Sequence, residues 1–218
     1  FNTLQCSFAG STCAGDVFTY TGTPLARITA GASATGTRIG TGSIILTSSN
    51  RLSLSYVIGN VNQTKADLEP QNFAAPGQVP FCSLQTPVGT GFRAGLSNYT
   101  DHWWGGTSAS GWGLQISHQS NQLFAGWYSY SPTGKATWLT LQGTQDSNNA
   151  RRFTGTIFQI ASGIPFSQIT GPIPASSNVA VGTFEFNFSD GEKGAFSYSL
   201  PPLGIVSGTL PLERFAIA

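Results

Sequence analysis

The side chains best suited to chemistry are concentrated in one stretch of this 218-residue chain, from Asp101 to Gln142. It contains all five tryptophans, both histidines and two of the six tyrosines. Indole and phenol rings are flat and amphipathic, so they offer apolar contact and, through the Tyr hydroxyl, a hydrogen bond. With the neighbouring Asn and Gln side chains, these residues indicate a surface for neutral polar ligands such as glycans.

The candidate ligand contacts are five residues, namely Trp103, Trp104, Tyr128, Tyr130 and His118. Adjacent residues of a strand point to opposite faces, and a Gly-Gly-Thr-Ser loop follows Trp104, so at least one of the two indoles is expected at a rim. The alternative role for the aromatic rings is to fill a core, which we expect of Trp112, Trp127 and Trp138. A lone histidine that ends an apolar face, as His118 does, is more often a hydrogen-bonded structural residue than a base or ligand.

Catalytic and metal-binding motifs are not found in the sequence. Asp101 and His102 diverge as neighbours in a strand, and no Ser or Cys lies in a nucleophile motif such as G-x-S-x-G. The nine acidic residues show no spacing that singles out an acid/base pair. Three cysteines and two histidines are too few and too scattered for a structural zinc site. The sequence therefore predicts a non-enzymatic protein without a metal or cofactor.

The composition excludes two classes of partner. Charged residues make up 9% of the chain, the formal net charge is +1, and the one basic pair is Arg151-Arg152. This leaves no electrostatic footprint for nucleic acid or for an anionic membrane. No run approaches the roughly 20 apolar residues that span a bilayer, so no membrane insertion is expected. The absence of Met suggests that Phe1 is a processed end, which favours an extracellular or periplasmic location.

The three cysteines, Cys6, Cys13 and Cys82, allow one disulfide and leave one thiol. Cys6 with Cys13 would close a small Gly/Ser loop, and either of them with Cys82 would tie the N-terminus to the end of the first half. Both possibilities remain open, and the local pair is slightly favoured.

The pattern of short apolar alternations predicts an all-β fold, an antiparallel meander that forms a barrel or sandwich. Within the aromatic stretch, strands are expected at 111–118, 123–130 and 136–142, with Trp112, Leu114, Ile116 and His118 sharing one face. Residues 1–17 are expected to be irregular. Further strands are expected at 18–28, 39–48, 51–58, 61–68, 153–160, 180–188, 195–200 and 205–210.

The two halves of the chain align with each other, which predicts an internal repeat. Ile39-Gly40-Thr41 and Leu54-Ser55-Tyr56 match Val181-Gly182-Thr183 and Phe196-Ser197-Tyr198 without a gap. The first copy lacks a counterpart of the aromatic stretch. We therefore expect a partial β repeat with a Cys-containing lead-in at 1–82, a connection containing Pro and Gly at 83–100, and a complete module at 101–218.

Several short motifs resemble a β-rich module of exported bacterial proteins, mainly from proteobacteria. They are Ser-Gly-Trp-Gly-Leu from Ser110, His118-Gln119, Leu-Phe-Ala-x-Trp-Tyr-x-Tyr from Leu123, and Gly-Lys-x-x-Trp-Leu from Gly134. Such modules tend to close with a basic residue shortly before the last Phe, a position that Arg214 occupies. The resemblance implies a β-rich exported protein and carries no activity.

These observations predict a secreted binding or adhesion protein that contacts a glycan or another cell-surface polymer through exposed aromatics. The alternative is a structural subunit of an extracellular assembly or filament, because a half-module leaves open strand edges through which copies could self-associate. A third possibility is an uncharacterised hydrolase-associated domain.

Overall fold

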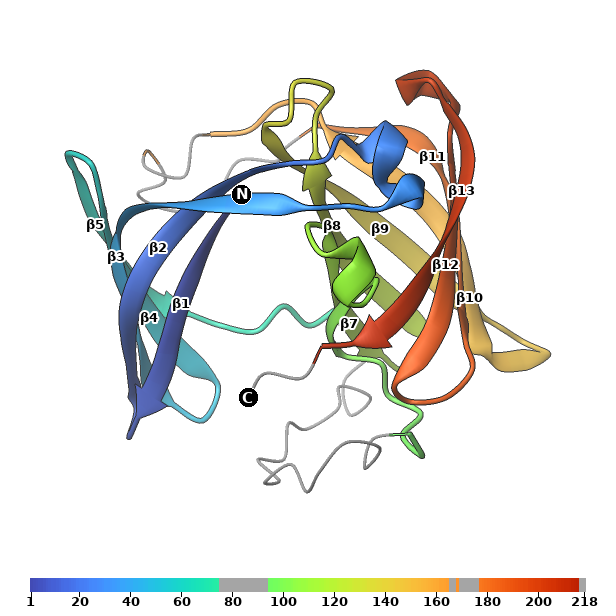
Figure 1. Ribbon diagram of the computed structural model, residues 1–218. Coiled ribbons are helices and arrows are strands. Elements are labelled where there is room, and N and C mark those ends of the chain that lie inside the picture. The colour runs from blue at the N-terminus through green and yellow to red at the C-terminus, as the bar shows by residue number, and fades with distance from the viewer. Residues whose placement is uncertain (75–93, 165–167, 169–176, 216–218) are drawn as a thin grey trace. The chain divides into compact units, whose positions relative to one another are not determined.

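The computed structural model describes residues 1–74, 94–164, 168 and 177–215 (Figure 1). The fold is all-β and antiparallel, as the sequence predicts, and consists of a five-stranded sheet and a closed eight-stranded barrel. Two compact units result. The first comprises 1–21, 35–71 and 162–177, and the second 22–34, 72–161 and 178–218. No helix in the described ranges is long and apolar enough to cross a bilayer.

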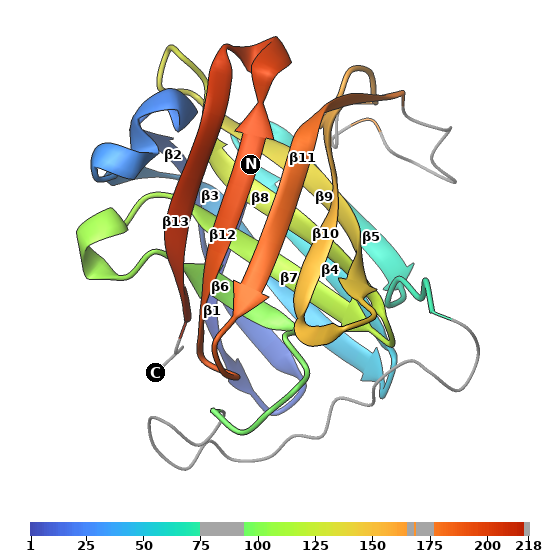
Figure 2. The same cartoon turned by 90° about the vertical axis from the view of Figure 1, so that its right-hand side faces the viewer.

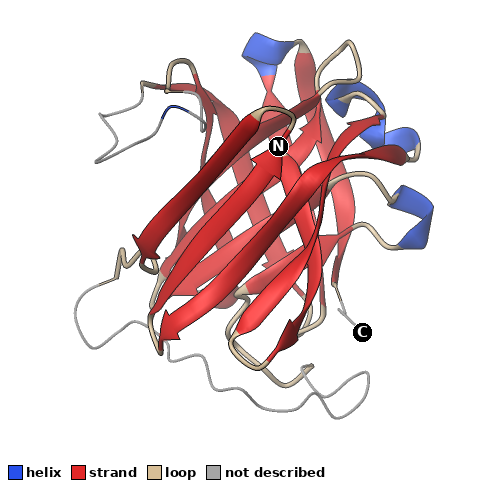
Figure 3. Ribbon diagram, turned by 90° about the vertical axis from the view of Figure 1, so that its left-hand side faces the viewer, coloured by secondary structure: helices blue, strands red, loops and turns tan. Residues whose placement is uncertain are grey.

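The first unit is an open sheet whose strands follow one another in sequence order (Figure 3). Its strands are β1 (Asn2–Ala9), β2 (Thr12–Gly22), β3 (Ala34–Ser48), β4 (Arg51–Ile58) and β5 (Val61–Leu68). Two-residue turns connect β1 to β2 and β4 to β5, and Gly10 and Gly59 take positive φ angles of 62° and 56° there. Glycine adopts this conformation without steric cost, which explains the tight hairpins.

The two faces of this sheet differ in polarity. A Cβ on Gly42 would meet Leu4 and Val17 at 3.3 Å, so these side chains share a face with Gly42 and with Tyr56 opposite it. We call this the apolar face; alternation along the paired strands adds Phe8, Ile44, Leu46, Leu52 and Leu54. The opposite, polar face carries mainly Thr, Ser, Gln and Asn side chains.

A disulfide between Cys6 and Cys13 joins β1 to β2. Cys6 lies opposite Gly15 and Phe8 opposite Cys13, so the bridge spans a diagonal of the hairpin with a Cα–Cα distance of 5.5 Å. This confirms the local pairing favoured by the sequence, while Cys82 lies outside the described residues. The bridge also shows that residues 1–17 are wrongly predicted as irregular, because they form β1 and half of β2.

The barrel forms the second unit, with strand order β10-β11-β12-β13-β6-β7-β8-β9, in which the last strand, β13, pairs with the first, β6, and closes the barrel (Figure 2). Its strands are β6 (Asp101–Trp104), β7 (Gly113–Gln119), β8 (Gln122–Tyr130), β9 (Ala136–Asp146), β10 (Asn149–Ile160), β11 (Asn178–Phe188), β12 (Lys193–Leu200) and β13 (Ile205–Arg214). Short 3-10 helices η2 (Thr107–Ala109) and η4 (Pro201–Leu203) lie in two of its connections.

Aromatic and aliphatic side chains fill the barrel interior. Trp127 packs edge-on against Phe196 and contacts Tyr198, each with a ring-centroid distance of 4.8 Å. Elsewhere in the interior, the Tyr99 ring stacks on the Phe188 ring with a centroid distance of 3.7 Å. The face predicted to be shared by Trp112, Leu114, Ile116 and His118 points inward, because all four side chains are buried. The core position predicted for Trp127 is also confirmed, and Leu123 and Ala125 of the same strand are buried with it.

The segment 22–34 belongs to the barrel unit, although it lies between two strands of the sheet in sequence. It contains the 3-10 helix η1 (Leu25–Ala30), whose Leu25 and Ile28 are buried in the barrel core. The predicted strand at 18–28 is therefore wrong beyond Gly22. Pro24 directly precedes η1 and favours the turn that ends β2, because the fixed φ angle of proline is compatible with the start of a helix.

The strand registers bear on the predicted repeat without establishing it. Gly42 pairs with Tyr56, and Phe184 pairs with Tyr198, so the β3–β4 and β11–β12 registers coincide at the predicted offset. A Cβ on either Gly40 or Gly182 would lie 1.9 Å from a carbonyl oxygen of the partner strand. The registers of β5 and β13 against their neighbours differ, with η4 inserted before β13. The repeat stays a prediction.

Arg214 joins the two strands at the shortest seam of the barrel. The β13–β6 register covers Glu213–Trp104 and Arg214–Trp103. The buried guanidinium lies 4.9 Å from the Trp103 ring centroid and donates from Nη2 to the Asn98 carbonyl at 2.7 Å. Its Nη1 also reaches an Asp101 carboxylate oxygen at 3.4 Å. One side chain therefore combines stacking, a backbone hydrogen bond and an ion pair across the seam.

We expect Arg214→Ala to lower the free energy of unfolding by about 2–3 kcal/mol, because the partly buried Asp101 carboxylate and the Asn98 carbonyl each lose one of their donors. Arg214→Lys should have an intermediate effect, since the charge stays but the planar fork is lost. Urea unfolding measures both. Arg152→Ala is the matched control, because Arg152 pairs with Asp146 and Glu185 at the surface and should cost less. Equal losses for Arg214→Ala and Arg152→Ala would contradict the role of Arg214 in closure.

Candidate functional site

The outer surface of the barrel carries a row of aromatic side chains across β6, β7, β8 and β9. Trp103 points inward and pairs with Leu114, so its neighbour Trp104 points outward, and continuing the β6–β7 register by one residue puts Trp104 next to Gly113. Gly113 pairs with Tyr128, and Tyr128 pairs with Trp138. We call Trp104, Gly113, Tyr128 and Trp138 the aromatic row.

The spacing of the aromatic row follows from sheet geometry. Directly opposed residues have Cβ atoms about 5 Å apart, which puts the Tyr128 and Trp138 side chains in contact range. Trp104 lies two strands from Tyr128, about 10 Å away across the sheet, and Gly113 between them has no side chain. Trp138 is 43% exposed, and Trp104 and Tyr128 are half-buried. The row thus has an aromatic side chain on each side of a bare strip of backbone.

Tyr128 lies flat on the sheet because a glycine precedes it by two residues. A Cβ on Gly126 would meet the Tyr128 hydroxyl and ring at 3.3–3.4 Å, so the ring occupies the space above Gly126. Its hydroxyl donates to Gln115 Oε1 at 3.3 Å. Burial raises the pKa of the Tyr128 phenol, so the hydroxyl stays protonated at neutral pH.

A second row of outward residues runs beside the first and is largely polar. His102 pairs with Gln115, Gln115 with Gly126, and Gly126 with Thr140. Phe158 of β10 ends this row opposite Thr140. The Thr140 hydroxyl is buried and makes no hydrogen bond within the described part of the chain. Amide, imidazole and hydroxyl groups therefore border the aromatic row on one side.

Two of the five predicted ligand contacts, Trp104 and Tyr128, lie in this row, and the structure places the other three elsewhere. Trp103 is 1% exposed and donates its indole N–H to the Tyr99 carbonyl at 2.9 Å. Tyr130 is outward on β8 but buried, because its ring lies against Gly22 of the segment that covers this end of the barrel. These side chains present no surface to solvent that a ligand could use.

His118 is part of the barrel interior. Its Nδ1 accepts the Tyr99 backbone N–H at 3.3 Å, so its Nε2 carries the proton and donates to the Ser120 carbonyl at 2.7 Å. The ring also stacks on Tyr99 with a centroid distance of 5.6 Å. Burial lowers the pKa of His118, and the Ser120 carbonyl raises it by a smaller amount. These contacts fit the structural role expected of a lone histidine on an apolar face.

Trp138 is the functional candidate that sequence reasoning missed. We expected it in the core, and the structure contradicts this, because the inward residues of β9 are Leu139 and Leu141. Alternation along β9 puts Trp138 and Thr140 on one face and the two leucines on the other, but it does not say which pair faces inward. The signal that could have found it is the register: Tyr128, already assigned to the outer face, stands opposite Trp138.

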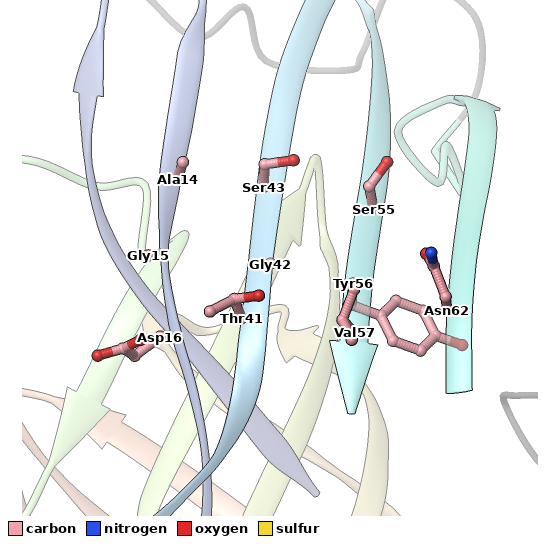
Figure 4. A pocket seen from close by; sticks show the side chains of 10 residues that line it. All are labelled: Ala14, Gly15, Asp16, Thr41, Gly42, Ser43, Ser55, Tyr56, Val57 and Asn62. Atoms are coloured by element: carbon pink, nitrogen blue, oxygen red, sulfur yellow. The ribbon is translucent and has the colours of Figure 1, made fainter. Parts of the chain in front are cut away.

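The sheet unit has a second candidate, a hollow of ≈ 490 Å³ on its polar face (Figure 4). Small residues form its floor, and Asp16, Thr41, Ser43, Ser55, Val57 and Asn62 are among those that line it. Asp16 already pairs with Arg38 at 2.7 Å, and Ser55 with Thr64 at 2.9 Å. Tyr56 is the one aromatic residue among those that line the hollow, and strand alternation assigns its side chain to the apolar face. The hollow is the weaker site for a polyol.

The geometry offers no catalytic arrangement in the residues that the structure describes. Asp101 accepts the backbone N–H of His102 and the guanidinium of Arg214, which ties it to barrel closure. Within the same residues, no three His, Cys, Asp or Glu side chains gather as a metal site requires. The groups that the aromatic row presents are flat rings suited to stacking, with hydrogen-bonding side chains beside them.

The pKa of His118 makes the barrel sensitive to acid. In the unfolded chain, His118 takes up a proton below about pH 6.5. The folded chain resists this because Nδ1 faces an N–H donor and burial disfavours the charge. The contribution of His118 to the free energy of unfolding should be fully present above about pH 6.5. The free energy of unfolding should then fall as the pH drops from there towards the lower pKa that His118 has in the folded chain.

His118→Gln should reduce this pH dependence, whereas the exposed His102 serves as the control in His102→Gln. Urea unfolding between pH 5 and 7 measures the slope for each variant. The acid sensitivity would not come from His118 if His118→Gln left the slope of the free energy of unfolding against pH unchanged. The same conclusion would follow if His102→Gln abolished that slope.

A scan against protein-family models finds no match for this chain, and comparisons with curated proteins and with solved structures find no similar protein.

Proposed function

We propose that this is an exported, non-enzymatic binding protein that contacts neutral glycans through the aromatic row of its barrel. The observation that carries the proposal is the register Gly113–Tyr128–Trp138, which lines up outward rings beside a strip without side chains. Flat sugar rings stack on aromatic faces, and their hydroxyls hydrogen-bond amides such as that of the exposed Gln115. The row spans several strands, so it suits an oligosaccharide rather than a single sugar.

The charge distribution favours a neutral ligand over a charged one. Trp104 lies opposite Glu213, and the groups that border the row are His102, Gln115 and Thr140. No Lys or Arg belongs to either row, so an anionic polymer would lack a counter-charge there. A polyol needs no counter-charge, because its affinity comes from stacking and neutral hydrogen bonds.

The disulfide supports a location of the protein in an oxidising compartment. Bridges such as Cys6–Cys13 form and persist in secreted and periplasmic proteins and are rare in the cytosol. The low content of charged residues fits the same setting, because Ser, Thr, Asn and Gln then provide most of the polar surface. An extracellular or periplasmic location would bring the aromatic row into contact with cell-surface polysaccharides.

The test is to screen the protein on a glycan array and to titrate the best binder while following tryptophan fluorescence. Trp138→Ala should weaken binding at least about tenfold, because it removes the most exposed ring of the row, and Trp104→Ala should do likewise. Neither change removes a core side chain, so circular dichroism should stay the same.

Val179→Ala is the matched control, because Val179 is 50% exposed on β11, outside the row. Its binding curve should overlay that of the unchanged protein. The proposal fails if no neutral glycan alters the fluorescence, or if Val179→Ala weakens binding as much as Trp138→Ala.

A further inference from the structure

The two edge strands of the five-stranded sheet are protected to different degrees. An edge strand exposes unpaired backbone N–H and C=O groups, and proteins usually shield it with charges, prolines or bulges. β1 has the sequence NTLQCSFA, with no charge and no proline. It pairs with β2 over eight consecutive residues without a register shift, so its edge is also free of bulges. In the described residues, no strand pairs with its other side.

β5 at the opposite edge has three protective features. Its register against β4 shifts between Leu52 and Leu54, and Asp67 there takes a positive φ of 58°. Arg51 of β4 forms ion pairs with Asp67 at 2.9 Å and with Glu69 at 3.0 Å. Lys65 adds a third charge to this edge. A bulge and fixed charges interrupt the hydrogen-bonding edge of β5, so it is a poor template for another strand.

We propose that β1 is a pairing edge for a second copy of this chain and that two β1 strands associate antiparallel about a two-fold axis. A filament would need both edges of the sheet, since each copy would have to accept a strand on one side and offer one on the other. The protected β5 edge excludes that arrangement. Pairing of β1 with β1 uses the same edge twice and closes after two copies.

Sheet geometry narrows the register of this pairing. The sheet has an apolar and a polar face, and a slip by one residue would turn one copy's apolar side chains to the other copy's polar face. Odd-numbered residues of one β1 strand must therefore stand opposite odd-numbered residues of the second copy, and even-numbered residues opposite even-numbered ones. Two registers keep most of β1 paired, one centred on Gln5 and one centred on Cys6.

The register centred on Cys6 buries more apolar surface. It places Phe8 opposite the second copy's Leu4, twice by symmetry, and Gln5 opposite Ser7. The register centred on Gln5 would instead place Phe8 opposite Asn2. Phe8 is 55% exposed in the single chain, so covering its ring with a leucine stabilises the first register.

The disulfide prepares β1 for this role. Edge strands fray, and a frayed strand must be ordered again before it can pair, which costs conformational entropy. The Cys6–Cys13 bridge holds β1 to β2 near the centre of the proposed contact. The backbone groups of β1 are therefore kept in an extended arrangement, which lowers the entropic cost of adding a strand.

Sedimentation equilibrium over a range of protein concentrations tests the proposal. The unchanged protein should pass from monomer to dimer with a dissociation constant on the order of micromolar, because strand pairing buries less area than a standard interface. Phe8→Lys places a charge on the apolar face of the edge and should raise that constant at least about tenfold. Val57→Lys is the control, because Val57 is 43% exposed on the interior strand β4, away from β1, and the substitution should leave the constant unchanged.

A double variant tests the register and does not depend on removing Phe8. In the register centred on Cys6, Gln5→Lys combined with Ser7→Glu brings opposite charges together across the two-fold axis and should strengthen the dimer. In the register centred on Gln5, the same variant places two lysines opposite each other and weakens the dimer.

A strict monomer, a ladder of larger masses, or equal effects of Phe8→Lys and Val57→Lys would each overturn the proposed pairing of two β1 strands. Glycan binding is measured separately, on the barrel, and its failure leaves this result unaffected.

Discussion

The contacts of the buried Arg214 guanidinium hold together the strand pairing on which closure of the barrel depends. An eight-stranded barrel removes its free edges only if the last strand pairs with the first, and here the seam between β13 and β6 is short. Arg214 strengthens it by holding the Asn98 carbonyl, the Asp101 carboxylate and the Trp103 ring together. The same seam orients β6. Once Trp103 is fixed inward beneath the guanidinium, alternation fixes Trp104 outward, and the aromatic row begins there.

The sequence predicted much of the barrel because alternation is a local property. The inward faces of β7 and β8 follow from residues two apart, and no knowledge of distant contacts is needed. Trp138 shows the limit of this reasoning. A strand such as β9, with bulky residues on both faces, does not reveal which face is buried, and the large area of a tryptophan wrongly favoured the core. The burial of Leu139 and Leu141 is decided by the closure of the barrel, which brings the β9 leucines inside.

The N-terminal region was harder to predict, for a different physical reason. β1 and β2 contain small and polar residues, and part of their order comes from a disulfide and from pairing in a hairpin rather than from an apolar alternation. The segment around η1 is short, and the three-residue spacing of Leu25 and Ile28 is too brief a pattern to distinguish a 3-10 turn from a strand. Arg214 was noted as a motif residue, but its contact with Asn98 joins parts of the chain that only the closed barrel brings together.

The difference between the two edges of the five-stranded sheet determines which kind of assembly the sheet favours. A sheet with two equivalent edges would favour open-ended assembly, whereas one usable edge favours a closed pair. The distinction matters for glycan binding, because stacking on a few exposed rings gives modest affinity for each site. A two-fold dimer carries two aromatic rows on one particle, so a polymer long enough to reach both binds the second row at a high effective concentration. If the proposed dimer and the proposed glycan binding both hold, limited assembly would raise avidity for a polysaccharide, and the ion pairs at the β5 edge would keep the protein from polymerising.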